Sequence, residues 1–117
     1  MAPLIRTETF RPTVAPEEIR DRVTAWFEHL DHRLVTDTPE RIEVTSGSQL
    51  KLRLIGGAFI AGSSLPTRTI VERGDDGQIT VTVSDAMGFG VKTGMRAKYE
   101  RWLDQVVQAV RSALTPA

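Results

Sequence analysis

The sequence predicts an α+β domain in which an antiparallel sheet of about five to six strands is packed by an N-terminal helix and a long C-terminal helix. Three patterns carry this prediction: short segments of alternating apolar and polar residues, one amphipathic helical segment near the start, and a longer one at the end. A period of two is typical of strands with one buried face, and apolar residues spaced about three to four apart are typical of helices. The predicted order is strand, helix, four to five strands, helix.

The first strand is predicted from Leu4 to Phe10, where apolar or hydroxyl side chains alternate with charged ones near a sheet edge. A helix is predicted to begin at Pro16, because proline lacks the N–H that would be unpaired in a first turn. The carboxylates of Glu17 and Glu18 complement the positive end of that helix dipole. The apolar residues that follow predict one buried stripe: Ile19, Val23, Trp26, Phe27 and Leu30.

Several strands are predicted in the middle of the chain. Short ones at residues 33–36 and 41–45 are separated by Asp37-Thr38-Pro39, and the alternation of Leu50, Leu52 and Leu54 predicts another. Residues 58–61 follow Gly56-Gly57 and are interpreted as a return strand. Residues 67–73 and 78–85 flank Gly74-Asp75-Asp76-Gly77, which predicts a hairpin. Three residues of its second strand are expected to face the core: Ile79, Val81 and Val83.

The last predicted element is a long helix with Thr93 as its N-cap. Its apolar residues form an unbroken stripe across four turns: Tyr99, Trp102, Leu103, Val106, Val107, Val110 and Leu114. This stripe and the apolar stripe after Pro16 are both expected to pack on the same layer of β-structure.

Composition limits the classes of function. Hydrophobic residues make up 40% and charged residues 26%, which is typical of one ordered domain over residues 1–117, with 115–117 as a disordered tail. Fifteen basic residues balance fifteen acidic ones, which argues against a nucleic-acid partner. Without cysteine there is no disulfide, thiolate metal site or cysteine nucleophile. The lack of a signal peptide or a long apolar run predicts a cytoplasmic protein with no membrane partner.

The order of elements resembles that of the helix-grip superfamily of START and Bet v 1-like domains. A first strand leads into the helix start Val14-Ala15-Pro16-Glu17-Glu18-Ile19, and Trp26 follows soon after. Antiparallel strands and a closing long helix complete the order. The resemblance implies a curved sheet that wraps the C-terminal helix and a cavity for an apolar ligand. This chain is shorter than is usual in that superfamily, and it has one helix before the main strands where two short ones are typical. Both departures are compatible with a small or missing cavity.

A glycine-rich segment, Gly88-Phe89-Gly90-Val91-Lys92-Thr93-Gly94, separates the last predicted strand from the last helix. Its spacing matches neither a Walker loop, which needs glycine where Val91 stands, nor a dinucleotide fingerprint. One remaining interpretation is an anion at the helix N-terminus beside Lys92 and Arg96. The favoured interpretation is a tight turn that the glycines permit.

Other polar groups are candidates for metal-binding or catalytic sites. His29 and His32 are spaced to share one side of a helix end, but no third ligand is identifiable, so no metal is expected. Asp75 and Asp76 are interpreted as turn formers, and Asp85 as a residue that ends a strand or lies at a cavity mouth. No G-x-S-x-G elbow and no set of acid, base and nucleophile is visible. The sequence therefore favours a protein that is not an enzyme and has no cofactor.

Two hypotheses of function follow. The first is a non-catalytic binding domain that holds a small apolar ligand between the sheet and the C-terminal helix. The large aromatic side chains of the helices are expected in the core: Trp26, Phe27, Tyr99 and Trp102. Five residues are predicted to bind the ligand: Phe59, Met87, Phe89, Met95 and Tyr99. The alternative is a protein-interaction or structural module, with a homodimer as one form, that uses the segment from Ala58 to Leu65 as an exposed edge.

Overall fold

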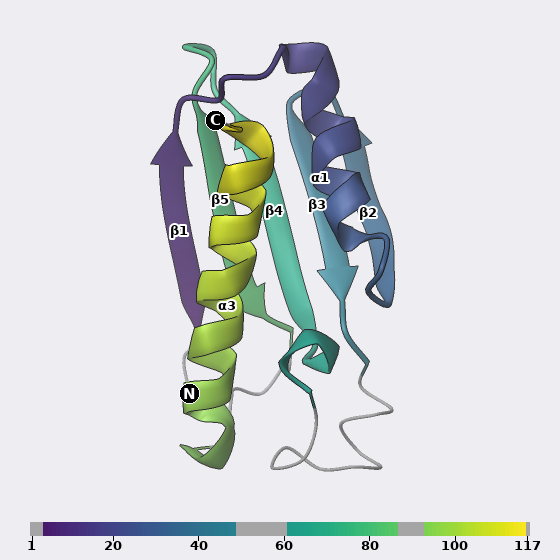
Figure 1. Cartoon of the computed structure of the whole chain (residues 1–117), viewed down its shortest axis with the longest axis vertical. Helices are drawn as coiled ribbons and strands as arrows, with labels where there is room; N and C mark the ends of the chain where they lie inside the picture. The colour runs from purple at the N-terminus through teal and green to yellow at the C-terminus, as the bar shows by residue number, and fades with distance from the viewer. Residues whose placement is uncertain (1–3, 49–60, 87–92, 117) are drawn as a thin grey trace.

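The computed structural model describes residues 4–48, 61–86 and 93–116. Its strands form one antiparallel sheet in the order β1-β5-β4-β3-β2, which places β1 and β2 at the two edges (Figure 1). The five strands of the described ranges fall within the predicted number. Their bounds are β1 (Ile5–Phe10), β2 (His32–Thr38), β3 (Arg41–Ser46), β4 (Thr67–Arg73) and β5 (Ile79–Asp85).

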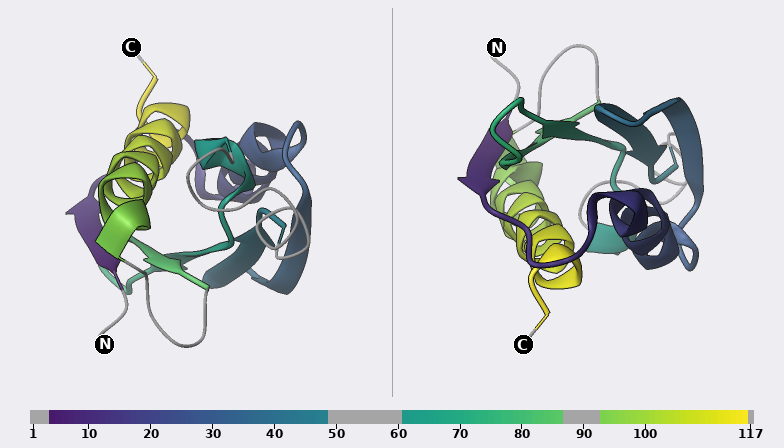
Figure 2. Two further views of the ribbon diagram at one scale, coloured as in Figure 1. Left: turned by 90° about the horizontal axis from the view of Figure 1, so that it is seen from below. Right: turned by 90° about the horizontal axis from the view of Figure 1, so that it is seen from above.

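Both helices cover the same face of this sheet. The N-terminal one begins as a single 3-10 turn, η1 (Pro16–Glu18), and continues as α1 (Ile19–Phe27), while the C-terminal one is α3 (Thr93–Leu114). Seen end-on in Figure 2, the strands follow an arc, and both helices lie on its inner side. The predicted α+β fold class is therefore confirmed, and the two helices also contact each other.

The core lies between the inner face of the sheet and the two helices. The side chains of Ile79, Val81 and Val83 on β5 are fully buried, as the alternation predicted. The predicted α3 stripe is also buried, from Tyr99 to Leu114. Each apolar side chain moved from water into this core contributes roughly 1.5–3 kcal/mol, so the stripe holds α3 on the sheet.

Aromatic side chains join α1, α3 and β4 at the centre of the core. The rings of Trp26 and Trp102 stack with centroids 6.0 Å apart. The Trp102 Nε1–H donates to Thr67 Oγ1 at 3.1 Å, and the Tyr99 hydroxyl donates to the Pro66 carbonyl at 2.8 Å. Trp102 and Tyr99 therefore each satisfy a polar atom while the ring is buried, which is the arrangement buried Tyr and Trp need.

A β-bulge in β2 changes the face of the sheet to which the side chains at the end of that strand point. Leu34 is opposite Val44 and Asp37 is opposite Ile42, with a register shift between Leu34 and Thr36. Val44 and Ile42 are both buried, so Leu34 and Asp37 also face the helices although they are three residues apart. An extra residue breaks the period of two. The prediction that Asp37 and Thr38 lie in a turn is wrong, because both residues pair with β3 and β2 continues to Thr38.

Other boundaries also differ from the sequence-based expectations. Helix α1 ends at Phe27, so neither His29 nor His32 shares its end, and His32 begins β2. The predicted strand at 50–54 and residues 58–60 lie outside the described residues, and Ala61 is not in a strand. Thr115, expected in a disordered tail, donates its N–H to the Arg111 carbonyl at 2.8 Å. No helix in the described ranges is both long and apolar enough to cross a membrane.

Candidate functional site

A pocket of about 600 Å³ lies at one end of the sheet, beneath the first turn of the N-terminal helix. We call it the terminal pocket. It opens where the turn between β2 and β3 meets the end of β4. Its lining residues come from four segments of the chain: Pro16, Glu17, Ile19 and Arg20; Asp37, Thr38 and Pro39; Ile42; and Arg73.

The floor of the terminal pocket is apolar. Ile19 is the first residue of α1 and keeps 7% of its surface exposed, and Ile42 on β3 keeps 4%. Pro16 stands at the first position of the helical segment, where its fixed φ sets the direction in which the chain enters. The terminal pocket is therefore a hollow above two core side chains, with polar groups around it.

An ion pair joins α1 to β2 across one wall of the terminal pocket. Arg20 Nε lies 2.7 Å from Asp37 Oδ2, and Arg20 Nη1 lies 3.2 Å from Asp21 Oδ1. The hydrogen bond to Asp37 is the largest cause that raises the pKa of Arg20 above its ordinary value. Because Arg20 is exposed, the pair adds little to stability. The pair lies between the start of α1 and the end of β2, so it forms a polar wall of the terminal pocket.

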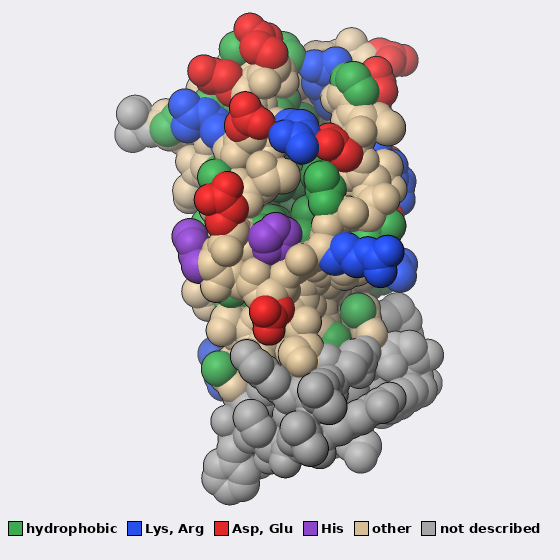
Figure 3. Space-filling model, turned by 90° about the vertical axis from the view of Figure 1, so that its right-hand side faces the viewer, with side chains coloured by type: hydrophobic (Ala, Val, Ile, Leu, Met, Phe, Trp, Pro, Cys, Tyr) green, Lys and Arg blue, Asp and Glu red, His purple; other side chains and the backbone are tan. Residues whose placement is uncertain are grey.

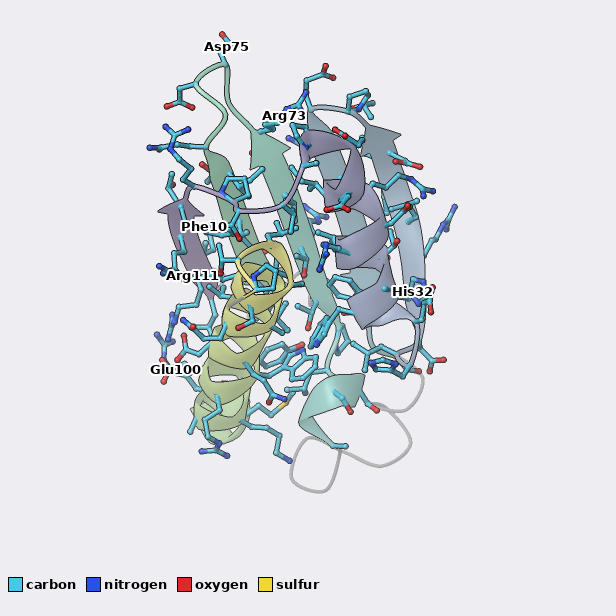
Figure 4. The ribbon with its side chains drawn as sticks, turned by 45° about the horizontal axis from the view of Figure 1, so that its top comes forward. Phe10, His32, Arg73, Asp75, Glu100 and Arg111 are labelled. Atoms are coloured by element: carbon cyan, nitrogen blue, oxygen red, sulfur yellow. The ribbon has the colours of Figure 1, made fainter. Side chains whose placement is uncertain are left out.

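A second arginine lies on the other side of the same hollow. Arg73 is the last residue of β4, and Figure 4 shows it at the end of that strand, close to the start of the helical segment. Its register partner Ile79 is fully buried, so the side chain of Arg73 points to the helix-covered face. The backbone N–H of Arg73 donates to the Glu40 carbonyl at 2.9 Å. Among the described residues its half-buried guanidinium has no hydrogen bond or ion pair.

The residues predicted to bind an apolar ligand are not brought together in the described part of the chain. Tyr99 is fully buried and Met95 keeps 7% of its surface, so both belong to the core. Burial, followed by the charge of Asp85, raises the pKa of Tyr99. Asp85 Oδ2 accepts the backbone N–H of Leu4 at 2.6 Å, which ties the start of β1 to the end of β5. Phe59, Met87 and Phe89 lie outside the described residues.

The other predicted groups have ordinary structural surroundings. Arg96 pairs with Glu100 at 3.3 Å on the surface of α3, and Lys92 lies outside the described residues. Figure 3 shows the two histidines as separate side chains on the surface. His32 Nδ1 is 2.9 Å from the Leu30 carbonyl, and the described ranges hold no group of three metal-ligating side chains. Asp76 Oδ1 accepts the Gln78 N–H at 3.0 Å within the hairpin turn.

Two smaller hollows of about 390 Å³ each are also present. One lies beside His32, Ser46 and Pro66, and the other lies between α3 and the 3-10 turn η2 (Gly62–Ser64). Neither has a floor of aliphatic side chains like the one that Ile19 and Ile42 provide. The terminal pocket is therefore the strongest candidate site within the described ranges.

Sequence reasoning did not single out the residues of the terminal pocket. The helical pattern puts Arg20 on the solvent side of the helix, and the hairpin pattern puts Arg73 at the end of a strand. The bulge that turns Asp37 toward Arg20 leaves no clear mark in a segment already rich in turn formers. A signal for Arg73 is available in the sequence, because period-two alternation from Val71 places Arg73 on the core face.

Comparison with known proteins supports the fold and leaves the activity open. No family model matches the chain, and no curated protein matches it. Among solved structures, the crystal structure of protein MLL2253 from Mesorhizobium loti, a Northeast Structural Genomics Consortium target, aligns with a TM-score of 0.57 and 10% identity. The alignment covers 95% of this chain and 96% of that one. At this identity the likeness shows a shared fold: a five-stranded antiparallel sheet with a short N-terminal and a long C-terminal helix.

Proposed function

We propose that this protein is a non-catalytic binding domain for a small molecule with an apolar body, held in the terminal pocket between the sheet and the start of α1. The observation that carries the proposal is a hollow of about 600 Å³ above Ile19 and Ile42. Ligand pockets of roughly 300–1,000 Å³ with apolar linings and a few polar groups are typical of small-molecule sites.

The proposal places the ligand under the N-terminal helix, whereas the sequence placed it under the C-terminal one. The interface between α3 and the sheet is tightly filled in the described ranges, where Val81, Leu103 and Val106 have no exposed surface. A ligand near Met95 and Tyr99 stays a prediction. Membership of the helix-grip superfamily is likewise a proposal, supported by the arc of strands around both helices in Figure 2.

Binding without catalysis is proposed because of how the acidic groups are placed. Asp37 is one of the two carboxylates that line the terminal pocket, and Arg20 Nε lies 2.7 Å from its Oδ2. This oxygen therefore already accepts a hydrogen bond from the guanidinium and is not free to contact a proton of a bound molecule. Glu17, the other carboxylate that lines the terminal pocket, is exposed to solvent, whereas a general base must be held within hydrogen-bond reach of the proton that it removes.

Calorimetric titration with 1-octanol, a neutral apolar probe, tests the proposal. We expect saturable binding at one site per chain, with a negative heat-capacity change because apolar surface is buried. Glu17→Trp places a large ring at the rim and should weaken binding, whereas the matched change Glu28→Trp, just past the other end of α1, should not. Absence of saturable heat, or equal loss in both variants, would overturn the assignment of the terminal pocket.

A protein-interaction module, including a homodimer, is the second candidate. The segment first suggested for it fits poorly in part, because Leu65 is fully buried, while residues 58–60 lie outside the described ranges. The edges of the sheet offer a different surface, since Val35 on β2 is 51% exposed and Ile5 on β1 is 49% exposed. Edge strands can pair with another chain. Sedimentation should then show a dimer that Val35→Lys disrupts, and a monomer at every concentration would exclude self-association.

A further inference from the structure

We infer that the ligand of the terminal pocket carries a carboxylate or similar anionic group, and that Arg73 binds this group. The inference rests on the proposed function and specifies its chemistry. Arg73 would hold the anionic end beside the last residue of β4, and the apolar body would lie over Ile42 and Ile19. Such a ligand belongs to the class of small amphipathic monocarboxylates.

Other charged strand residues on the helix-covered face have partners, which shows what is unusual about Arg73. Asp85 on β5 accepts the backbone N–H of Leu4 at 2.6 Å. On β1, Arg6 Nε lies 2.8 Å from Asp104 of α3, and Glu8 pairs with Arg111 of the same helix. On β2, Asp37 pairs with Arg20 of α1. Each of these charges on β1 and β2 therefore meets an opposite charge on a helix.

Within the described part of the chain, the side chain of Arg73 lacks a partner of either kind. It lies on the same face and is half-buried, yet no helix carboxylate pairs with it. The neighbouring Glu72 cannot serve, because it faces the other side of the sheet, where its Oε2 accepts a bond from Arg41 at 3.2 Å. A partly buried charge without a partner is unfavourable. An anion bound in the terminal pocket would provide the missing partner and use the paired donors of the guanidinium.

The sign of the ligand charge follows from where the free charges stand. Arg20 and Asp37 neutralise each other, which leaves Arg73 and Glu17 among the lining residues. Glu17 is exposed at the rim, whereas Arg73 is half-buried. Coulomb interactions are weakened most by water at exposed positions. The field inside the terminal pocket is therefore set mainly by Arg73, and it favours an anion.

Three probes with the same eight-carbon chain test this inference: octanoate, 1-octanol and octylammonium. We expect octanoate to bind roughly tenfold more tightly than 1-octanol, since one partly exposed charge-assisted contact is gained. Arg73→Gln should remove this advantage, so that octanoate and 1-octanol bind the variant with similar affinity, while Arg73→Lys should restore part of it. Arg33→Gln is the matched control, because Arg33 is also a strand arginine without an ion pair in the described ranges and does not line the terminal pocket.

The outcomes separate the inference from the proposed function. Equal affinity for octanoate and 1-octanol, or tighter binding of octylammonium, would overturn the anionic ligand while the binding pocket stands. An octanoate preference that survives Arg73→Gln would overturn the role of Arg73. Failure of all three probes to bind would overturn the proposed function itself. Circular dichroism of each variant checks that it is folded, and Arg73→Lys supplies a second reading if Arg73→Gln is unstable.

Discussion

Gly47→Ala should be among the most damaging single-methyl additions to this fold. Gly47 follows β3 with a φ of +88°, a backbone conformation that residues with a side chain rarely adopt. A Cβ at this position would lie 2.2 Å from the Leu65 carbonyl oxygen and 2.8 Å from the Pro66 nitrogen. Both are backbone atoms leading into β4, so relief requires a shift of the strand itself. The left-handed backbone and the overlap together should cost roughly 2–5 kcal/mol.

Two other glycines separate the cost of the left-handed backbone from the cost of the steric overlap. Gly77 has a similar φ of +83°, but its added Cβ would meet nothing nearer than an Arg11 guanidinium nitrogen at 3.6 Å. Gly77→Ala should therefore cost only the conformational part, roughly 1–2 kcal/mol. Gly62 lies in a 3-10 turn, and its nearest neighbour is the Trp102 Cβ at 3.9 Å. Gly62→Ala should be neutral or stabilising by about 0.4–1 kcal/mol.

Urea unfolding followed by far-UV circular dichroism measures this series. The expected order of unfolding free energies is Gly62→Ala, then Gly77→Ala, then Gly47→Ala as the least stable. If Gly47→Ala is no worse than Gly77→Ala, the close approach of Gly47 to the Leu65–Pro66 backbone is refuted, because the two sites share the conformational cost and differ in that approach.

Three further predictions concern the core and its surface. Tyr99 is the only tyrosine, and its pKa is raised in the folded state. The folded chain therefore keeps the phenol proton at a pH where the unfolded chain loses it. The free energy of unfolding should be unaffected below the ordinary pKa of 10.0 and should fall as the pH rises above that value. Phenolate absorbance of the native protein should appear only with unfolding, and titration of a folded chain near the ordinary value would contradict the burial. Leu103→Ala, at a fully buried position, should cost about 2–5 kcal/mol by urea unfolding, against little change for the exposed Gln105→Ala. Arg96→Gln breaks an exposed pair with Glu100 and should change stability by about 0.5 kcal/mol or less, so a large loss would show that the surface pairs of α3 matter more than screening allows.

The regular parts of the fold were predictable because burial and periodicity agree there. The α3 stripe from Tyr99 to Leu114 and the hairpin of β4 and β5 match their predicted faces, since each apolar side chain packs on one continuous layer. The end of β2 was not predictable, because one extra residue at the bulge reverses every side chain beyond it. Asp37 thereby leaves the expected turn and faces a helix.

The candidate site was harder to predict for the same physical reason. The terminal pocket is assembled from segments that are distant in sequence, and its contacts depend on the bulge and on how α1 crosses the end of the sheet. The sequence pattern favours a pocket near glycine-rich segments and flexible apolar residues such as Met95. The structure places Met95 in the core, and the free charge lies at Arg73, in a strand whose position was correctly predicted.

The location of the bound ligand tests the central claim most directly. Octanoate added to the isotopically labelled protein should shift backbone amide signals in the first turn of α1, at Thr38 and Ile42, and at Arg73. Signals along the middle of α3, such as those of Leu103 and Val106, should stay in place. Saturable shifts confined to the neighbourhood of Met95 and Tyr99, with the residues around Arg73 unchanged, would contradict a site at this end of the sheet.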